Sequence, residues 1–349
     1  MVTLLPALLA GLLSMLSMPL IILVARKKGW FDPPEARKLH TEPTPRLGGV
    51  GIFWSFFLVM VAGLLATGRQ RDALQLLPVF SLMVSIHLLG LWDDFHNLRA
   101  KLRFLVQLLA AVLAVAFGYR FHAVYLPFVG EVSLGILSYP LTVVWIVGVI
   151  NALNMIDGMD GLSGGISILA AFSFGLIYLE RGIELPALMA VVLAGSLAGY
   201  LFFNFPPARI FMGDSGSTFL GFALALFPLM AGEGSADAGL WFWDGITILA
   251  VPIFDVFAAM LRRQRQGVSW MSPDRWHLHH KLLHLGFGTR AILAIVYATC
   301  MALGAVAVSV LYLSPLAHWL VVIASWLVLM GLFVVLHFAK ERSLKRTGR

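Results

Sequence analysis

Five aspartates lie at the ends of long apolar runs of the sequence. Asp93 and Asp94 end one run, Asp157 and Asp160 follow another, and Asp214 begins a third. A carboxylate within a membrane-spanning segment costs roughly 2.5–3.5 kcal/mol on insertion scales. Helix capping accounts for a single aspartate at such a place. It accounts less well for adjacent carboxylates, which repel each other, and the set therefore predicts a bound cation.

The type of ligand indicates which cation. Oxygen ligands favour a hard ion, and Mg2+ is commonly held by one or two carboxylates together with phosphate oxygens. Glycines beside the aspartates, among them Gly158, Gly161, Gly213 and Gly216, let backbone N–H groups approach an anion closely. The lone cysteine, Cys300, leaves no thiolate metal cluster. We therefore expect Mg2+, with Mn2+ able to replace it, and a phosphate-bearing ligand.

Basic side chains form a third component. The segment 262–290 contains Arg275 and the histidines His277, His279 and His280. Three histidines could bind zinc, but no cysteine or spaced fourth ligand accompanies them, and imidazoles that donate to phosphate oxygens fit better. On a helix, His277 and His280 would share one face. An imidazole that donates through both ring nitrogens is protonated, so activity is expected to fall above a pH of about 6.5.

A second basic segment, 26–47, carries Lys38, His40 and Arg46. These side chains can donate to phosphate. A basic loop at a lipid headgroup surface would have the same composition, and the sequence leaves both interpretations open.

These residues must be positioned by membrane helices. Of the 349 residues, 60% are hydrophobic and 12% charged, with a mean hydropathy of +0.88. That composition excludes a water-soluble globule, and continuous rather than alternating apolar runs exclude a porin-type barrel. Runs of about 17–25 apolar residues cross a bilayer as helices. The sequence predicts an all-α polytopic integral membrane protein with about eleven transmembrane helices, at residues 2–25, 48–66, 76–92, 104–120, 138–155, 164–180, 186–204, 216–232, 243–261, 291–313 and 316–339.

Charge placement predicts how the chain is oriented. If the N-terminus is outside, 21 of the 25 Lys and Arg fall on the inner side and 4 on the outer side. The positive-inside rule thus places the C-terminus in the cytoplasm, and the net charge of +7 requires no nucleic acid. All five aspartates then lie at the cytoplasmic face of a single multi-span domain, 1–349. Its inner loops are 26–47, 93–103, 156–163, 205–215 and 262–290.

These motifs, in this order, resemble those of the polyprenyl-phosphate N-acetylhexosamine-1-phosphate transferase family, which includes WecA-, TagO- and MraY-type enzymes. The resemblance covers residues 33–290. It rests on Arg37-Lys38-x-His40 with Pro45-Arg46-x-Gly48-Gly49, Asp93-Asp94, Asn151-x-x-Asn154-x-x-Asp157-Gly158-x-Asp160-Gly161, Asn204-x-x-Pro207-Ala208-x-x-Phe211-Met212-Gly213-Asp214-Ser215-Gly216, and His277-x-His279-His280.

The resemblance implies a reaction at the cytoplasmic face of the bacterial inner membrane. A sugar 1-phosphate passes from a UDP-N-acetylhexosamine to a polyprenyl phosphate, UMP is released, and a cell-envelope glycan such as lipopolysaccharide or teichoic acid is begun. The family also tends to form homodimers, although no small-xxx-small interface is evident. The resemblance assigns the nucleotide to Asn154, Asp157, Asp160, Asn204 and Phe211, and the phosphates or sugar to Lys38, His40, Arg46, Arg275, His277, His279 and His280.

Elementary chemistry agrees with that reaction. Joining a phosphomonoester of about −1.5 to −2 charge to a diphosphate requires neutralised repulsion and an attacking oxygen aligned with the phosphorus. Asp214, with Asp94 close by, is the expected ligand of Mg2+. Asp93 or Asp94 would remove a residual proton or orient the acceptor phosphate. A covalent aspartyl-phosphate route would use the same pair as nucleophile, and we favour direct attack.

Two departures from the MraY-type pattern indicate which UDP-sugar is the donor. MraY-type members carry a Lys three residues after the aspartate pair, where this chain has Asn97, and an unbroken His triplet, where this chain has Leu278. UDP-N-acetylglucosamine is therefore expected rather than UDP-MurNAc-pentapeptide. A secondary transporter is the alternative from another class, but its carboxylates would lie near the bilayer midplane and no inverted repeat is evident.

Overall fold

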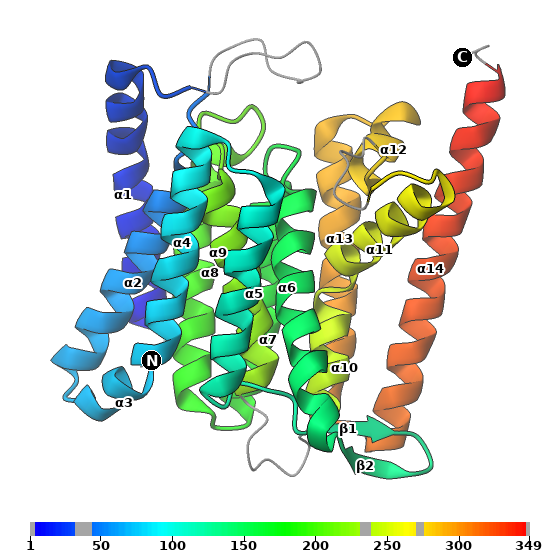
Figure 1. The fold of residues 1–349 in the computed structure, drawn as a ribbon, viewed down its shortest axis with the longest axis horizontal. Helices are drawn as coiled ribbons and strands as arrows, with labels where there is room; N and C mark the ends of the chain where they lie inside the picture. The colour runs from blue at the N-terminus through cyan, green and yellow to red at the C-terminus, as the bar shows by residue number, and fades with distance from the viewer. Residues whose placement is uncertain (1–3, 32–43, 231–238, 270–275, 347–349) are drawn as a thin grey trace.

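The structure is a computed structural model, and it describes residues 4–31, 44–230, 239–269 and 276–346. The chain forms one bundle of helices with a small hairpin at one end (Figure 1). The elements are α1 (Leu4–Lys28), α2 (Gly48–Ala66), α3 (Gln70–Gln75), α4 (Leu77–His96), α5 (Ala100–Ala116), β1 (Ala123–Leu126), β2 (Gly130–Ser133), η1 (Gly135–Leu137), α6 (Ser138–Ile156), α7 (Leu162–Glu180), α8 (Glu184–Asn204), α9 (Asp214–Met230), α10 (Leu240–Ile248), α11 (Ala250–Arg265), α12 (Leu278–His284), α13 (Thr289–Val308), η2 (Ser309–Leu311) and α14 (Pro315–Arg346).

The all-α polytopic architecture is confirmed. Eight described helices are long and apolar enough to cross a membrane, or nine if the bent pair α10–α11 is one span. Among the described residues, most of each of the eleven predicted runs is helical. However, α5 and α9 have only 17 residues, about 25 Å of helix against a hydrocarbon core of about 30 Å. The predicted count of eleven spans therefore exceeds what the described helices support.

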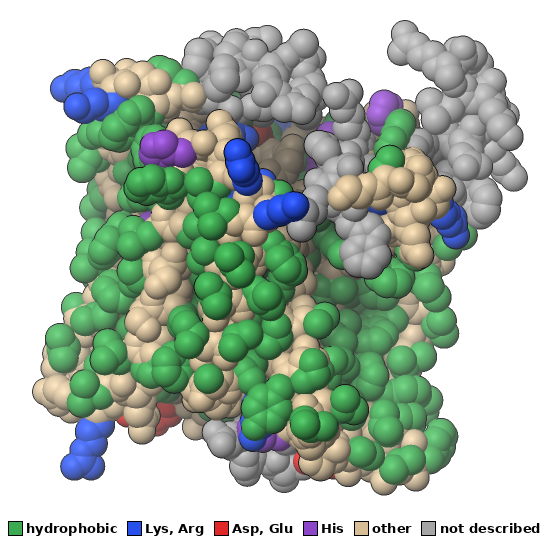
Figure 2. Space-filling model, in the orientation of Figure 1, with side chains coloured by type: hydrophobic (Ala, Val, Ile, Leu, Met, Phe, Trp, Pro, Cys, Tyr) green, Lys and Arg blue, Asp and Glu red, His purple; other side chains and the backbone are tan. Residues whose placement is uncertain are grey.

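Hydrophobic side chains cover most of the face seen in Figure 2, and Lys and Arg gather at its upper and lower ends. In water such a surface would drive aggregation. In a bilayer, lipid tails solvate it and the helices satisfy their own backbone groups.

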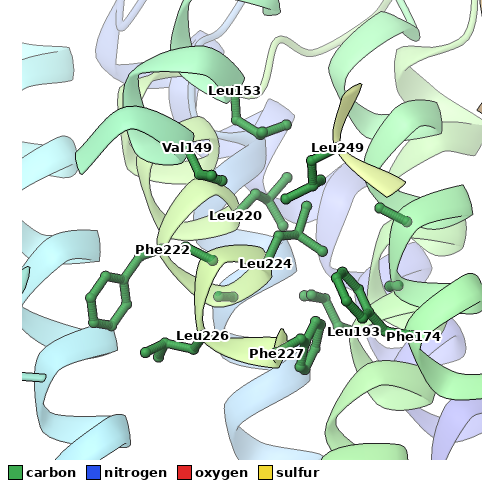
Figure 3. Packing of buried hydrophobic residues seen from close by; sticks show 14 of the residues in the cluster. Val149, Leu153, Phe174, Leu193, Leu220, Phe222, Leu224, Leu226, Phe227 and Leu249 are labelled. Atoms are coloured by element: carbon green, nitrogen blue, oxygen red, sulfur yellow. The ribbon is translucent and has the colours of Figure 1, made fainter. Parts of the chain in front are cut away.

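Helix α9 lies at the centre of the bundle. Every residue from 215 to 229 is buried, as expected for a helix that is apolar on all sides. Figure 3 shows Leu220, Leu224 and Phe227 packed among side chains of the neighbouring helices. The first residue of α9, Asp214, is therefore carried by the most enclosed element of the fold.

The predicted span 243–261 is two helices rather than one. Helices α10 and α11 meet at a bend of 78°. Pro252 has no N–H to donate to the carbonyl of Ile248, four residues earlier, and a proline of this kind breaks a helix. Figure 1 shows α11 running obliquely toward α14, with Arg262, Arg263 and Arg265 in its last turn.

A two-stranded hairpin, which the sequence analysis did not predict, connects α5 to α6. Strands β1 and β2 are antiparallel, with Ala123 opposite Ser133. The N–H of Tyr125 donates to the carbonyl of Gly239 at 2.9 Å, and the indole N–H of Trp243 donates to the carbonyl of Tyr125 at 2.6 Å. These bonds hold the hairpin beside the start of α10, at the opposite end of the bundle from α12 (Figure 1).

Helix α1 packs closely against α8 through glycines. A Cβ built on Gly195 would lie 2.1 Å from the carbonyl oxygen of Ala7, and one on Gly199 would lie 2.2 Å from that of Gly11. Gly195-x-x-x-Gly199 is a small-xxx-small motif, and it packs two helices of one chain, so a dimer interface of this kind stays unsupported. The chain uses this motif internally.

Gly199→Ala is expected to destabilise the protein, because the new methyl group would overlap a backbone oxygen that moves only if α1 moves. Overpacking of this kind costs about 1–3 kcal/mol, measurable as a lower thermal midpoint of the purified protein in detergent. Gly148→Ala is the matched control, since a Cβ on Gly148 has nothing within 4 Å. Equal midpoints for the two variants would contradict the α1–α8 packing.

Candidate active site

The N-terminus of α9 is held by Asp94 of α4. One carboxylate oxygen of Asp94 accepts the N–H of Asp214 at 2.7 Å, and the other accepts the N–H of Ser215 at 3.0 Å. The first N–H groups of a helix have no acceptor within it, and a carboxylate there also interacts favourably with the helix dipole. The structure thus brings Asp94 and Asp214 together, as the sequence predicts.

Asp93 faces a different partner. Its Oδ1 accepts the N–H of Leu98 at 2.6 Å, and its Oδ2 pairs with Arg103 of α5 at 2.8 Å. The Arg103 Nη1 is also 3.8 Å from Asp214 Oδ2. The sequence analysis missed Arg103, although it lies only ten residues after Asp93, across the turn between α4 and α5. Because each adjacent carboxylate has its own donors, repulsion within the pair does not itself require a cation.

Asp214 is held on one side and open on the other. The side-chain amide of Asn154 donates to Asp214 Oδ1, and also to Ser217 Oγ at 2.9 Å. The side chain of Asp214 is 26% exposed, against 3% for Asp93. Its Oδ2 is therefore the oxygen that a ligand arriving from the end of the bundle could reach.

The carboxylate oxygens of this site fit a hard cation that is only partly enclosed by protein. Asp94 and Asp214 supply oxygen ligands, whereas no three His, Cys, Asp or Glu side chains among the described residues form a group that could hold a metal ion. Mg2+ is commonly bound by one or two carboxylates and completed by water or phosphate oxygens. The arrangement suits Mg2+ that arrives with a phosphate ligand.

Asp157 lies close enough to Asp214 and Asp94 for their charges to affect its pKa. Burial, and then the nearby carboxylate of Asp214, raise its pKa to about 7, with smaller contributions from Asp94 and Asp160. The guanidinium of Arg46 acts in the opposite direction. The predicted clustering of the aspartates at one end of the bundle is thus observed.

Asn204 and Asp160, which are predicted to bind the nucleotide, connect two loops. The side chain of Asn204 accepts the N–H of Gly161 and donates to the carbonyl of Ile210, each at 2.9 Å. Asp160 Oδ2 accepts the N–H of Ala208 at 2.9 Å. Both side chains are buried, and they join the loop after α6 to the loop after α8. A direct role in nucleotide binding stays a prediction for both.

The segment before α2 lies against the loop before α9. The N–H of Phe211 donates to the carbonyl of Pro45 at 2.7 Å, and the N–H of Gly48 donates to the carbonyl of Phe211 at 2.8 Å. Gly213 has φ +75°, and a Cβ there would lie 2.2 Å from the carbonyl oxygen of Arg46. Only glycine fits both constraints. The backbone of Phe211, whose side chain is half-buried, is thereby held beside the segment 45–48.

Three predicted phosphate-binding residues, Lys38, His40 and Arg275, lie outside the described residues. Their roles stay predictions.

His277 is oriented by a residue that the sequence analysis missed. Asp255 of α11, which is buried, binds His277 Nδ1 through one oxygen and accepts the N–H of Leu278 through the other, both at 2.8 Å. A lone carboxylate in an apolar helix was the signal that could have revealed it. Helix α12 begins at Leu278, so the expectation that His277 and His280 share a helical face was wrong.

His279 faces the aspartate loop without a partner. It is buried, and neither ring nitrogen has a hydrogen bond among the described residues. A Cβ built on Gly158 would lie 2.9 Å from its Nε2. Burial, and then the neighbouring His280, lower its pKa to about 3. This pKa favours the neutral ring in the ligand-free protein, and the protonated imidazole expected with phosphate bound stays a prediction.

An apolar cavity of about 170 Å³ lies directly beside the histidine helix. Helices α11 to α14 contribute most of its described lining, which is hydrophobic except for Thr299. Leu278 and Leu282 contribute from α12, Val296 from α13 and Phe333 from α14. A mostly apolar space next to a polar site suits a ligand with both kinds of surface.

The chain is similar to known transferases over most of its length. Residues 76–232 match glycosyl transferase family 4. Over 301 residues, 85% of this chain and 82% of the other, it is 34% identical to a probable undecaprenyl-phosphate N-acetylglucosaminyl 1-phosphate transferase of Bacillus subtilis. It is 33% identical over 305 residues, 79% and 74% of the two chains, to a decaprenyl-phosphate N-acetylglucosaminephosphotransferase of Mycobacterium tuberculosis. It is 29% identical over 345 residues, 93% and 86%, to an undecaprenyl-phosphate alpha-N-acetylglucosaminyl 1-phosphate transferase of Escherichia coli.

Asp255→Leu is expected to release the start of α12, because it leaves His277 and the N–H of Leu278 buried without acceptors. Unsatisfied groups of this kind cost about 1–3 kcal/mol each. Hydrogen exchange of residues 277–285 should accelerate, and the thermal midpoint should fall. Asp72→Leu, which removes a partly exposed pair with Arg69, is the control with little expected effect. Unchanged exchange at α12 would contradict the role of Asp255.

The raised pKa of Asp157 predicts a pH dependence of stability. A group with a pKa near 7 when folded and about 3.9 when unfolded binds more protons in the folded state, so stability falls as pH rises between these values. Thermal midpoints of the ligand-free protein in chelator should decline from pH 4 toward pH 7. In Asp157→Asn this decline should be smaller, and identical profiles would show that Asp157 does not titrate in this range.

Proposed function

The chain belongs to glycosyl transferase family 4, and from that membership we propose that it transfers N-acetylglucosamine 1-phosphate from UDP-N-acetylglucosamine to a polyprenyl phosphate. The products are the polyprenyl diphosphate sugar and UMP. The observation that carries the proposal is the convergence of Asp94, Asn154 and Asp157 on Asp214. It places hard oxygen ligands, neutral hydrogen-bond donors and a helix N-terminus at one end of an apolar bundle.

The proposed donor site is built around Asp214. Asn154 and Asp94 fix this residue from two sides, so its partly exposed Oδ2, 3.8 Å from Arg103, would meet a ligand without first having to reorganise. Mg2+ bound there with the donor diphosphate would offset negative charge and polarise the bond that breaks. Neutral His279 can donate one N–H to a phosphate oxygen and so gain the partner that it lacks.

The proposed reaction is direct attack by the acceptor phosphate. Both oxygens of Asp93 and both oxygens of Asp94 already accept hydrogen bonds from the protein. An aspartyl-phosphate route would require one of them to leave its donors and become a nucleophile. A phosphomonoester is itself anionic near neutral pH. These residues therefore serve better by orienting the acceptor and by holding Arg103 and α9 in place.

The acceptor lipid accounts for the apolar surroundings. We propose that the first prenyl units enter the cavity beside α12, because Leu278 lines that cavity between the two histidines that flank it in the sequence. We further propose that the site faces the cytoplasm of a bacterial inner membrane, on the positive-inside argument. A homodimer stays a proposal from the family's tendency.

The choice of N-acetylglucosamine over MurNAc-pentapeptide has two supports. The relatives named above carry N-acetylglucosamine in their names. Asn97, which replaces the MraY-type Lys, ends α4 in the left-handed conformation with φ 47°, where asparagine is better tolerated than lysine. The position serves as a helix end in this chain, and we assign it no contact with the donor.

Purified protein in detergent, given labelled UDP-N-acetylglucosamine, polyprenyl phosphate and Mg2+, should transfer label to the lipid phase and release UMP. EDTA should abolish transfer, and Mg2+ or Mn2+ should restore it. Asp214→Asn should lower kcat by about two or more orders of magnitude, because the ligand oxygen is lost, with an unchanged elution profile. Glu184→Gln, which alters an exposed carboxylate beside Arg69, is the control.

Each arm of this experiment has an opposing outcome. Efficient product from UDP-MurNAc-pentapeptide alone would reverse the donor assignment. Full activity in chelator would show that the reaction needs no metal ion. Wild-type turnover by Asp214→Asn would show that Asp214 is not the metal ligand.

A further inference from the structure

A buried histidine lies two helical turns below the aspartate pair and has no place in the reaction described so far. His87 of α4 is 0% exposed. Its Nδ1 lies 3.1 Å from the carbonyl oxygen of Ser215, at the start of α9. A carbonyl can only accept, so this nitrogen carries the hydrogen and donates. The other ring nitrogen has no hydrogen-bond partner among the described residues.

His87 and Asp94 therefore form hydrogen bonds with the same residue, Ser215. Asp94 accepts the N–H of Ser215 at 3.0 Å, and His87 donates to its carbonyl. Both polar groups of one backbone residue are thus held by two side chains of α4. Residues 87 and 94 are two turns apart on one helix face, so a straight α4 presents both to α9 at once.

Gly90 leaves the space that these two hydrogen bonds require between α4 and α9. It lies between the two residues on the same face, and a Cβ there would lie 2.5 Å from the carbonyl oxygen of Asp214 and 2.6 Å from Cα of Ser215. Any larger residue would push α9 away from α4. The backbones meet at the peptide that carries the Asp214 carboxylate.

The ring of His87 is itself fixed. It stacks on Phe53 of α2, with centroids 4.1 Å apart and planes 5° apart. Phe53 in turn makes an edge contact with Phe219 of α9 at 5.1 Å. The donor nitrogen therefore cannot swing away from Ser215 without unpacking three helices.

We propose that His87 is a positioning residue, which sets the direction of the Asp214 carboxylate by holding the Ser215 carbonyl while Asp94 holds its N–H. The inference rests on the proposed function, since it matters only if Asp214 serves the transfer. The N–H of Ser215 belongs to the peptide before this residue and its carbonyl to the peptide after it, so the two side chains together restrain the backbone on both sides of Ser215. A displacement of about 1 Å in a reacting group costs on the order of 10²-fold in rate.

The test compares substitutions that keep or move the donor. In His87→Asn the side-chain amide nitrogen is as many bonds from Cβ as Nδ1 is, so the donor is kept. In His87→Gln it is one bond too far, and in His87→Phe the ring remains but the donor is lost. We expect kcat to fall on the order of 10²-fold in the Phe and Gln variants, with KM for UDP-N-acetylglucosamine unchanged, and to recover substantially in the Asn variant. Leu88→Phe, on the exposed side of α4, is the control with wild-type kcat.

A second readout does not depend on activity. Hydrogen exchange of residues 212–217 should accelerate in His87→Phe and stay near wild type in His87→Asn and Leu88→Phe. If wild-type protein shows no transfer, the proposed function fails, and the exchange data still decide whether His87 holds the peptide. Wild-type kcat and wild-type exchange in folded His87→Phe would overturn the inference. If that variant does not fold, equal kcat in the Asn and Gln variants would overturn it.

Discussion

The burial of one helix N-terminus is the constraint on which the rest of the site depends. Helix α9 is buried from Ser215 to Leu229, so its first N–H groups need acceptors within the protein. Asp94 accepts two of these N–H groups, which places a second acidic side chain beside Asp214. The remaining polar contacts follow from this pair. Asn154 binds Asp214, Arg103 lies between two of the carboxylates, and Gly213 lets the chain turn into the helix.

The polar residues of the site divide into those that hold loops and those that remain open to a ligand. Asn204 and Asp160 connect loop to loop, and Asp255 holds the start of α12. Neither ring nitrogen of His279 has a hydrogen bond among the described residues, and the side chain of Asp214 is partly exposed. An unpaired buried donor or acceptor costs stability, and such costs are typical of functional sites. His279 and Asp214 are therefore the side chains that a ligand can contact without breaking a hydrogen bond that holds a loop.

Much of the fold could be predicted from the sequence because lipid imposes a simple rule on it. The apolar runs form helices, with a bend within the run 243–261, and the aspartates gather at one end of the bundle, since helix ends carry the polar residues. The bend follows from the missing N–H of Pro252, which the sequence itself contains. The contacts of Arg103 and Asp255 depend instead on α5 and α11 lying beside distant segments. The protonation of His279 could not be predicted, because burial and not residue type determines it.

The glycine contact between α1 and α8 has a consequence for how the chain is made. Gly11 is synthesised early, but its partner Gly199 follows 188 residues later, which takes about 10–40 s at 5–20 residues per second. During that interval α1 has no α8 to pack against and is retained in the bilayer by its own mean hydropathy of 2.4. Its largely lipid-facing surface, only 17% buried in the finished bundle, suits a helix that must wait in lipid. The narrow glycine strip finds its partner only when α8 has been made.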